Sequence, residues 1–233
     1  MEFTLLARAF TAATAAWLMI RWEAKRGNAA GCAIDIWDAA LMATVGGVLV
    51  GRLMAMVSSG INPLTDPGQI LLVRSGVSTI GASIAAIAIF AFLARRDVLG
   101  LFDAVAPAAL AGLAGWHGGC VVTNECLGVE SGLPWATSLN GSAVTRHPVE
   151  LYAAALLAIG AIALALWKQH GRPAPGVPTG VALMVASGTR LATEPLRISL
   201  GGGPVLFYVA GVVIGIAIVA WAITSNRNQT SHV

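Results

Sequence analysis

Apolar residues gather in seven long stretches of the chain, separated by shorter polar connections. A helix needs roughly 17–25 residues to cross a bilayer, and each stretch comes close to that length. We therefore predict an all-α integral membrane protein with one polytopic domain over residues 1–233 and no separate soluble domain. The predicted transmembrane helices lie near residues 3–21, 38–58, 77–94, 101–122, 149–167, 177–194 and 204–223.

Basic residues are divided unequally between the two sets of connections that these spans create. The richer set comprises Arg21, Lys25, Arg26, Arg95, Arg96, Lys168, Arg172 and Arg227. The poorer set comprises Arg74, Arg146 and Arg197. Because cytoplasmic connections carry the excess of Lys and Arg, the richer set is expected inside. We predict an outer N-terminus, a cytoplasmic C-terminus and a first apolar stretch that is retained as a span.

The composition agrees with a membrane protein. Hydrophobic residues make up 57% of the chain and charged residues only 11%, against about 25% charged in soluble domains. The net charge of +3 is modest and its basic residues are scattered, so no nucleic-acid partner is expected. Three cysteines do not make a disulfide framework. Cys120 and Cys126 could pair, but we expect them to be small packing residues.

The connection between the fourth and fifth predicted spans is long, polar and poor in basic residues. It reads HGGCVVTNECLGVESGLPWATSLNGSAVTRHPVE and is rich in Gly, Asn, Ser and Thr. We expect an outward-facing loop region near residues 117–150, folded at the outer membrane surface. A functional site is expected in this loop and at the helix ends beside it.

Three charges stand close together at the end of the sixth predicted span. Arg190, Glu194 and Arg197 have i, i+4, i+7 spacing, which places them on one face of a helix. Glu194 can neutralise one arginine, so one positive charge is left for an anion. Pro195 should kink or end the helix near Glu194. The alternative is that all three charges lie at the outer interface and extend into water.

A second polar group begins the fifth predicted span. Arg146, His147, Glu150 and Tyr152 are expected to cluster at its outer end, with Pro148 as the first helical residue. Glu150 then falls in the first turn, where the helix dipole favours an acid. Taken alone, this pattern fits a capped helix start with an interfacial tyrosine better than a site.

Further polar residues interrupt apolar surroundings. His117, Asn124 and Glu125 lie in a glycine-rich segment, and Arg52 needs a partner or an anion at membrane depth. Arginine binds phosphate through two parallel hydrogen bonds, so a phospholipid head group would suit such a set. We expect no metal and no cofactor, since the His residues lack ligand spacing and no nucleotide-binding loop is present. The arginines near the outer leaflet are Arg52, Arg146, Arg190 and Arg197, and the acids are Glu125, Glu150 and Glu194.

Five segments in the same order resemble the prolipoprotein diacylglyceryl transferase family, seven-span enzymes of the bacterial inner membrane. RHPVELYAAAL is similar to the family's R-H-P-S-Q-L-Y-E-A-L, and NECLGVESGLPW to G-E-L-W-G-x-x-T-D-L-P-W. GTRLATEPLR is similar to F-R-F-L-V-E-x-x-R-E-P and GGVLVGRL to G-G-R-I, while RRDVLGLFDAVAPAALAG resembles a further family stretch. The resemblance covers roughly residues 45–200.

The resemblance implies a reaction. Family members transfer a diacylglyceryl group from phosphatidylglycerol to the thiol of a lipobox cysteine in a prolipoprotein, and glycerol phosphate leaves. By position it implies functional roles for Glu125, Gly128, Arg190 and Glu194. Such chemistry needs a thiolate, a base to form it, and cations that hold the departing phosphate. The implied partners are phosphatidylglycerol, a prolipoprotein and membrane lipids.

Three of the chain's departures from the family's motifs replace a candidate base, a phosphate-binding Arg and a signature Asn. Ile80 stands where the family has His, His117 where it has a signature Arg, and Cys120 where it has Asn. In one interpretation His117 takes over part of the function of the replaced residues, either as a base or as a hydrogen-bond donor to the phosphate. In the other, the chain is a diverged homologue: a membrane transferase with another acceptor, or a lipid-binding or transport protein.

The residues of the expected site fall into two groups. The expected catalytic residues are His117, Glu125, Arg190 and Glu194. The expected head-group residues are Arg52, Asn124, Gly128, Arg146, His147, Tyr152 and Arg197.

Overall fold

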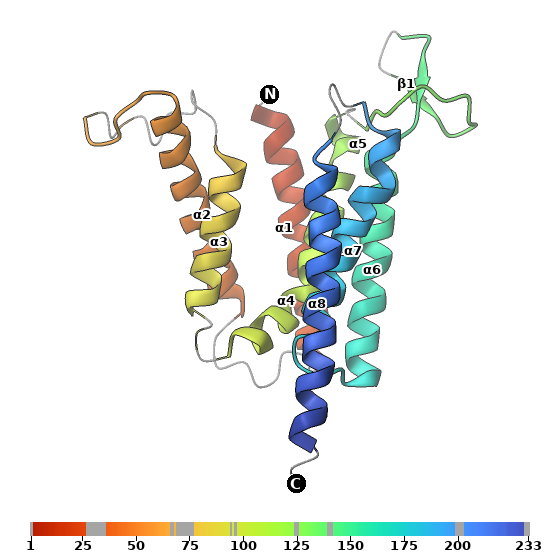
Figure 1. Cartoon of the computed structure of the whole chain (residues 1–233). Helices are drawn as coiled ribbons and strands as arrows, with labels where there is room; N and C mark the ends of the chain where they lie inside the picture. The colour runs from red at the N-terminus through yellow and green to blue at the C-terminus, as the bar shows by residue number, and fades with distance from the viewer. Residues whose placement is uncertain are drawn as a thin grey trace. The chain divides into compact units, whose positions relative to one another are not determined.

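A computed structural model gives the fold (Figure 1). The chain divides into two compact units, Met1–Ala30 with Phe102–Val233 and Gly31–Leu101, and each is described by itself. The residues that the structure describes are 2–26, 36–65, 68, 77–93, 95, 97–123, 126–138, 142–198 and 203–230.

Helices form most of the described structure, as predicted. The smaller unit contains α2 (Ile36–Ser58) and α3 (Thr79–Leu93). In the larger unit, a two-stranded antiparallel hairpin pairs β1 (Thr137–Ser138) with β2 (Thr145–Arg146). Its helices are α1 (Glu2–Ala24), most of α4 (Val98–Gly118), α5 (Cys120–Thr123), α6 (Val149–Gly171), α7 (Val177–Thr193), the 3-10 helix η3 (Glu194–Leu196) and α8 (Val205–Thr230).

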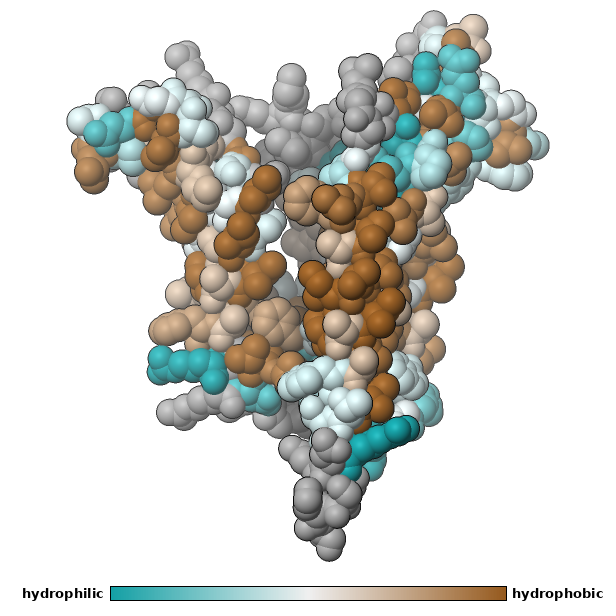
Figure 2. Space-filling view, in the orientation of Figure 1, coloured by the Kyte–Doolittle hydropathy of each residue, from teal (hydrophilic) through white to brown (hydrophobic). Residues whose placement is uncertain are grey.

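Each of the seven predicted stretches coincides with a helix of 15 residues or more, and the described part of the chain is that of a multi-pass membrane protein. Four described helical segments are long and apolar enough to cross a bilayer: Ile36–Ser58, Val98–Val122, Val149–Gly171 and Val205–Arg227. Ile80–Leu93 in α3 is apolar but shorter. On the face of the larger unit shown in Figure 2, α8 is brown along its middle and paler towards its C-terminal end.

The last helix is longer than predicted. We expected its span to stop near residue 223 and a short polar tail to follow, but α8 continues to Thr230. The loss of hydropathy marks where an apolar surface ends, whereas polar residues can still continue a helix that has already formed. Hydropathy alone therefore underestimates the length of this helix.

Small residues bring neighbouring helices into close contact. In the smaller unit, a β-carbon on Gly47 would lie 2.8 Å from that of Ala86, and one on Gly51 would lie 2.7 Å from that of Ala82. The amide of Ser78 also donates to the carbonyl of Gly51 at 3.0 Å. Gly-x-x-x-Gly spacing permits such backbone approach between apolar helices, which gain packing and hydrogen bonds rather than hydrophobic burial in lipid.

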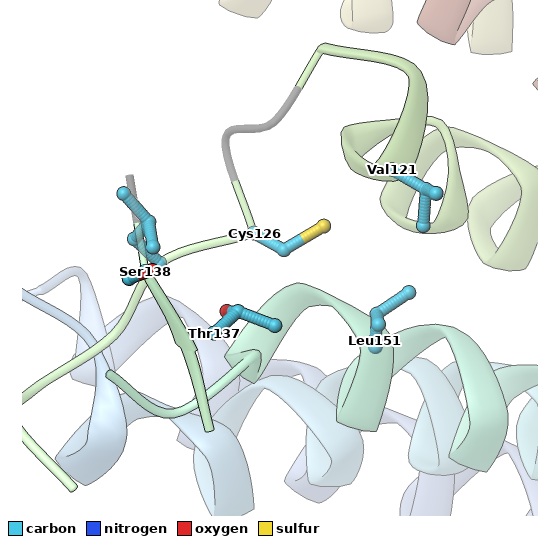
Figure 3. Close-up of a pocket in the computed structure, with 6 residues that line it drawn as sticks. Val121, Cys126, Thr137, Ser138 and Leu151 are labelled. Atoms are coloured by element: carbon cyan, nitrogen blue, oxygen red, sulfur yellow. The ribbon is translucent and has the colours of Figure 1, made fainter. Parts of the chain in front are cut away.

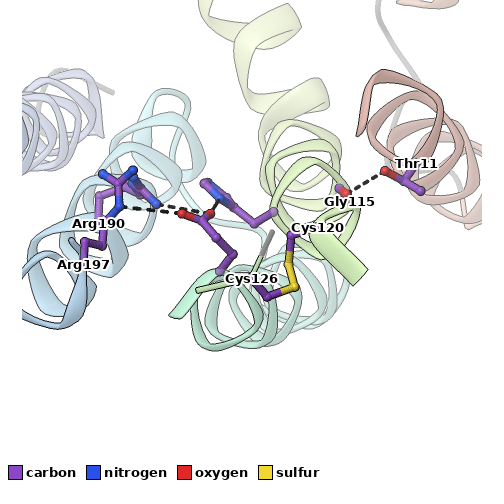
Figure 4. Close-up of a disulfide and its surroundings, with 8 residues drawn as sticks. Thr11, Gly115, Cys120, Cys126, Arg190 and Arg197 are labelled. Atoms are coloured by element: carbon purple, nitrogen blue, oxygen red, sulfur yellow. Dashed lines mark hydrogen bonds and ion pairs between the residues drawn. A yellow bond between two sulfur atoms is a disulfide. The ribbon is translucent and has the colours of Figure 1, made fainter. Parts of the chain in front are cut away.

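The larger unit uses the same device twice. Thr11 in α1 donates its hydroxyl to the carbonyl of Gly115 in α4 at 2.8 Å, a contact drawn in Figure 4. Between α7 and α8, a β-carbon on either Gly180 or Gly215 would come within 2.8 Å of the other's carbonyl oxygen. The core of this unit lies where α4, α6 and α7 meet, around the fully buried Leu110 and Leu157.

Two polar anchors hold the end of the larger unit that lies away from the hairpin. Asp103 in α4 accepts hydrogen bonds from the amides of Gly176 and Thr179, at 2.6 and 2.9 Å, at the start of α7. Lys168 in α6 donates to the buried Glu23 of α1 at 3.1 Å. The amides at the start of a helix lack hydrogen-bond acceptors within that helix. Asp103 therefore provides acceptors for two amides at the start of α7.

Candidate active site

Glu150 is the centre of a charged network at the hairpin end of the larger unit. It lies in the first turn of α6, and its Oε2 is within hydrogen-bonding distance of Nδ1 of His117 near the end of α4. Arg190 Nη1 lies 3.7 Å from the same oxygen, and Arg197 Nε lies 3.6 Å from Oε1. Three other segments of the chain therefore converge on the Glu150 carboxylate, whose side chain is only 14% exposed.

The Arg190–Glu194–Arg197 element is built differently from its predicted helical face. The prediction that the helix ends near Glu194 is confirmed, because α7 stops at Thr193. A short 3-10 helix containing Pro195 follows, and Arg197 is already extended. The expectation of one α-helical face is therefore wrong for Arg197. It reaches Glu194 through an i, i+3 ion pair, with Nη1 to Oε2 at 3.2 Å.

Pairing with Glu150 also changes the expected charge balance. Arg190, Arg197 and Glu194 alone would leave one positive charge. Glu150 pairs with both arginines, so two arginines now face two carboxylates. The network is neutral when the His117 imidazole is neutral and carries one positive charge when that imidazole is protonated. The expected surplus for an anion thus depends on the proton of His117.

The residues predicted to cluster at the start of α6 separate into two groups. Glu150 joins the charged network, whereas Tyr152 contacts residues of the loop region. The Tyr152 hydroxyl accepts a hydrogen bond from the indole of Trp135 at 2.8 Å and lies 3.3 Å from Nδ1 of His147. Pro148 is the N-cap and not the first helical residue, and no side chain caps the helix there.

Gly128 occupies a position that only glycine fits. A β-carbon there would collide with the Val149 side chain and with the carbonyl oxygen of Leu196. Its amide donates to the carbonyl of His147 at 2.7 Å, and its carbonyl accepts from Nη1 of Arg146 at 3.3 Å. Gly128 therefore joins the loop region, the start of α6 and the end of η3. The functional glycine expected from the resemblance has a close-packing role in the fold.

Cys120 and Cys126 form a disulfide, so the expectation that they are packing residues is wrong. Their α-carbons lie 5.1 Å apart, a separation that a disulfide bridges without backbone movement. The bond links the start of α5, three residues after His117, to the segment that leads to Gly128 (Figure 4). Sequence spacing did not show this, because the pairing depends on how close the fold brings the two α-carbons.

A cavity of about 120 Å³ is lined by six residues, one of which is Cys126 of this disulfide (Figure 3). None of the residues expected to bind or react is part of its lining. The arrangement of charge therefore makes the Glu150 network, and not this cavity, the candidate active site. The lining residues are Val121, Cys126, Leu127, Thr137, Ser138 and Leu151.

Several expected site residues do not belong to the network that the structure describes. Asn124 and Glu125 lie outside the described residues. Arg52 is buried in α2, and Ile80 lies at the start of α3 with a largely exposed side chain. Both belong to the smaller unit, so they are described apart from the Glu150 network.

Two residues near the network were not expected there. Tyr208 in α8 lies beneath the guanidinium of Arg190, with 5.8 Å between the Arg190 Cζ and the ring centroid. Arg8 in α1 packs against Gly119, where an added β-carbon would lie 2.9 Å from the Arg8 α-carbon. Arg8 could have been noticed from the sequence, because it is a charged residue inside the first apolar stretch. Nothing in the sequence indicates that Tyr208 and Arg190 would meet.

Comparison with known proteins shows the family to which the chain belongs. The family model described as prolipoprotein diacylglyceryl transferase matches residues 6–225. Three proteins named phosphatidylglycerol–prolipoprotein diacylglyceryl transferase are similar to the chain. The protein of Solidesulfovibrio magneticus is 29% identical over 84% of this chain and 76% of its own length. That of Cupriavidus pinatubonensis is 30% identical over 81% and 74%, respectively.

The third relative, from Bordetella bronchiseptica, is 30% identical over 170 residues. The match covers 70% of this chain and 65% of that relative, just under two thirds of its length. The family model covers nearly the whole chain, and the residues that converge on Glu150 lie within the matched range. The chain belongs to the prolipoprotein diacylglyceryl transferase family.

Proposed function

We propose that the chain transfers the diacylglyceryl group of phosphatidylglycerol to the cysteine thiol of a prolipoprotein, the reaction for which its relatives are named. It is a transferase of lipoprotein biosynthesis, and its substrates are phosphatidylglycerol and a prolipoprotein. The observation that carries this function is the convergence of Arg190, Arg197 and His117 on one carboxylate. Two guanidinium groups and an imidazole are the groups that a phosphate leaving group and a thiol proton require.

The proposed reaction is a displacement at the carbon that carries the phosphate. His117 takes the proton of the lipobox thiol, and the thiolate forms a bond to the terminal glyceryl carbon of the diacylglyceryl group. The bond from that carbon to the phosphate oxygen breaks, and its electron pair leaves with glycerol phosphate. Arg190 and Arg197 hold the phosphate as its charge increases, which stabilises the transition state.

The other expected residues take supporting roles in this proposal. Glu194 orients Arg197, and Gly128 holds the loop region against the start of α6. Glu125 is a further catalytic acid or base, following the resemblance. The remaining residues would hold the head group or the lipobox segment: Arg52, Asn124, Arg146, His147 and Tyr152.

The proposed setting is the bacterial inner membrane. We infer seven spans in a single polytopic domain, an outer N-terminus, a cytoplasmic C-terminus and an outward-facing loop region near residues 117–150. Two observations support this. In the larger unit, α1 begins at the hairpin end and α8 ends at the opposite end (Figure 1). Arg21 and Lys168 lie in the last turns of α1 and α6, away from the hairpin.

The function is tested by transfer in a purified system. The full chain in phosphatidylglycerol-containing nanodiscs should attach a diacylglyceryl group to a lipobox peptide and release glycerol phosphate. It should also restore lipoprotein acylation in cells depleted of their own enzyme. Membrane expression without transfer in either assay would contradict the proposal. Turnover of phosphatidylglycerol onto another acceptor, or lipid movement without covalent transfer, would assign the chain to a diverged function.

A further inference from the structure

The contact between His117 and Glu150 joins two departures from the motifs of the resemblance. His117 stands at the position of a signature Arg, and Glu150 at the Gln of R-H-P-S-Q-L-Y. The two side chains come from different helices, α4 and α6, and are 11% and 14% exposed. A histidine thus replaces an arginine and an acid replaces an amide, and the two new side chains contact each other. Together they form a pair that can carry out acid–base chemistry.

The geometry around Glu150 distinguishes this contact from the others. The arginine nitrogens stand 3.6 and 3.7 Å from the carboxylate oxygens, beyond the usual length of a hydrogen bond. His117 Nδ1 is within hydrogen-bonding distance. A carboxylate can only accept, so Nδ1 carries the proton and donates it to Oε2. The lone pair of neutral His117 is then on Nε2, which is the nitrogen available to a thiol proton.

We propose that Glu150 is the positioning residue for His117: it holds the imidazole as the Nδ1–H tautomer, so that Nε2 accepts the thiol proton. The inference rests on the proposed function, and it adds a residue to which neither the resemblance nor the family's names give a role. An acid in this position fixes the ring orientation and stabilises the imidazolium that forms. The proton moves from sulfur to Nε2 while Glu150 stays a carboxylate.

Charge balance supports this role. With neutral His117, the two arginines and the two carboxylates of the network cancel. Transfer of the thiol proton gives the network one positive charge. In the same step the phosphate changes from a singly charged diester to a more negative monoester. The protonated His117 therefore supplies positive charge when the leaving group needs it. Without Glu150, an imidazolium beside two arginines would be repelled.

Kinetics on the full chain in phosphatidylglycerol nanodiscs test the pair. Glu150→Met removes the acceptor and should lower kcat by about 100-fold, the size of a lost general-base contribution. The KM for phosphatidylglycerol should stay within about threefold, because Arg190 keeps its contact with Tyr208 and Arg197 keeps its pair with Glu194 when Glu150 is replaced. Glu150→Gln keeps an acceptor oxygen without the charge and should restore part of kcat. Asp38→Asn, an exposed first-turn acid of α2, is the matched control and should leave kcat unchanged.

A double variant separates positioning from a purely structural role. If Glu150 acts through His117, the double variant Glu150→Met/His117→Ala should be no slower than His117→Ala alone. A folding defect from Glu150→Met would instead add to the loss. Additive losses, or a kcat that survives both substitutions at Glu150, would overturn the proposal.

A spectroscopic readout decides the tautomer without any turnover. In protein labelled with ¹⁵N-histidine, the His117 signal is identified by its loss in His117→Ala. The wild type should show protonated Nδ1 and unprotonated Nε2, and Glu150→Met should lose that preference. A wild type in which neutral His117 carries its proton on Nε2 would overturn the proposal, whether or not transfer occurs. Failed transfer with the expected tautomer would instead count against the proposed function.

Discussion

Gly203 lies so close to Glu194 that a β-carbon on the glycine would coincide with the Oε1 of the carboxylate. The Glu194 side chain is only 6% exposed, and its other oxygen holds Arg197 at 3.2 Å. The backbone just before α8 thus forms one wall around the acid that orients an arginine of the site.

Gly203→Ala should therefore displace the Glu194 carboxylate and loosen its pair with Arg197. We expect a transfer rate lower by about tenfold or more, because small displacements of an orienting group cost reaction rate steeply. The measurement is diacylglyceryl transfer to a lipobox peptide. Gly132→Ala is the control, since nothing lies within 4 Å of a β-carbon there. Equal losses in the two variants would show that the Glu194 contact is not responsible.

Gly128→Ala should reduce the stability of the loop region. The added methyl group meets the Val149 side chain and the Leu196 carbonyl, and that backbone atom cannot rotate away. We expect a loss of about 1–3 kcal/mol, as for overpacked sites, together with lower activity. Thermal unfolding in detergent measures the first, and Gly132→Ala again serves as control. An unchanged midpoint would contradict the close packing.

Tyr208 should support Arg190 through its ring and not through its hydroxyl. Tyr208→Phe keeps the face over which the guanidinium lies, so it should keep nearly full activity. Tyr208→Leu removes the cation–π contact, worth about 0.5–2 kcal/mol, and should weaken phosphatidylglycerol use several-fold. The KM for phosphatidylglycerol measures the effect. Loss of activity in Tyr208→Phe would instead give the hydroxyl a role of its own.

The Cys120–Cys126 disulfide predicts a specific thiol count. Denatured, unreduced protein should show one alkylated cysteine, Cys32, and reduced protein should show all three. Cys120→Ala with Cys126→Ala should lower the free energy of unfolding by about 2 kcal/mol, from the entropy of closing so short a loop. Mass spectrometry and thermal unfolding measure the two effects. Three alkylated cysteines without reduction would contradict the disulfide.

Asp103 should anchor α7 through its acceptor oxygens. Asp103→Ala leaves the Gly176 and Thr179 amides without that partner, at a cost of about 1–3 kcal/mol. Asp103→Asn keeps one acceptor oxygen and should lose less. Asp97→Ala removes an exposed contact to the Gly100 amide and is the matched control, with a cost near 1 kcal/mol. Thermal midpoints that fall equally in all three variants would contradict the anchor.

The sequence by itself determined the helical class and the positions of the long helices. Apolar stretches of membrane length are a local property, so α2, α4, α6 and α8 could be located from hydropathy alone. Pro195 predicted the end of α7 for the same reason, since its missing N–H acts within one helical turn. The spacing of Arg190 and Glu194 and the motifs around them likewise indicated where charge would collect.

Only the tertiary structure decided which of these charges meet. Glu150 had the pattern of a helix-capping acid, yet α4 brings His117 to it and η3 brings Arg197 to it. The Cys120–Cys126 disulfide and the contact of Arg190 with Tyr208 likewise appear only in the folded structure. Hydropathy and spacing report what a segment does alone. Which side chains contact each other depends on how the helices pack. Close contacts at glycine, such as that of Thr11 with Gly115, determine how near two helices approach.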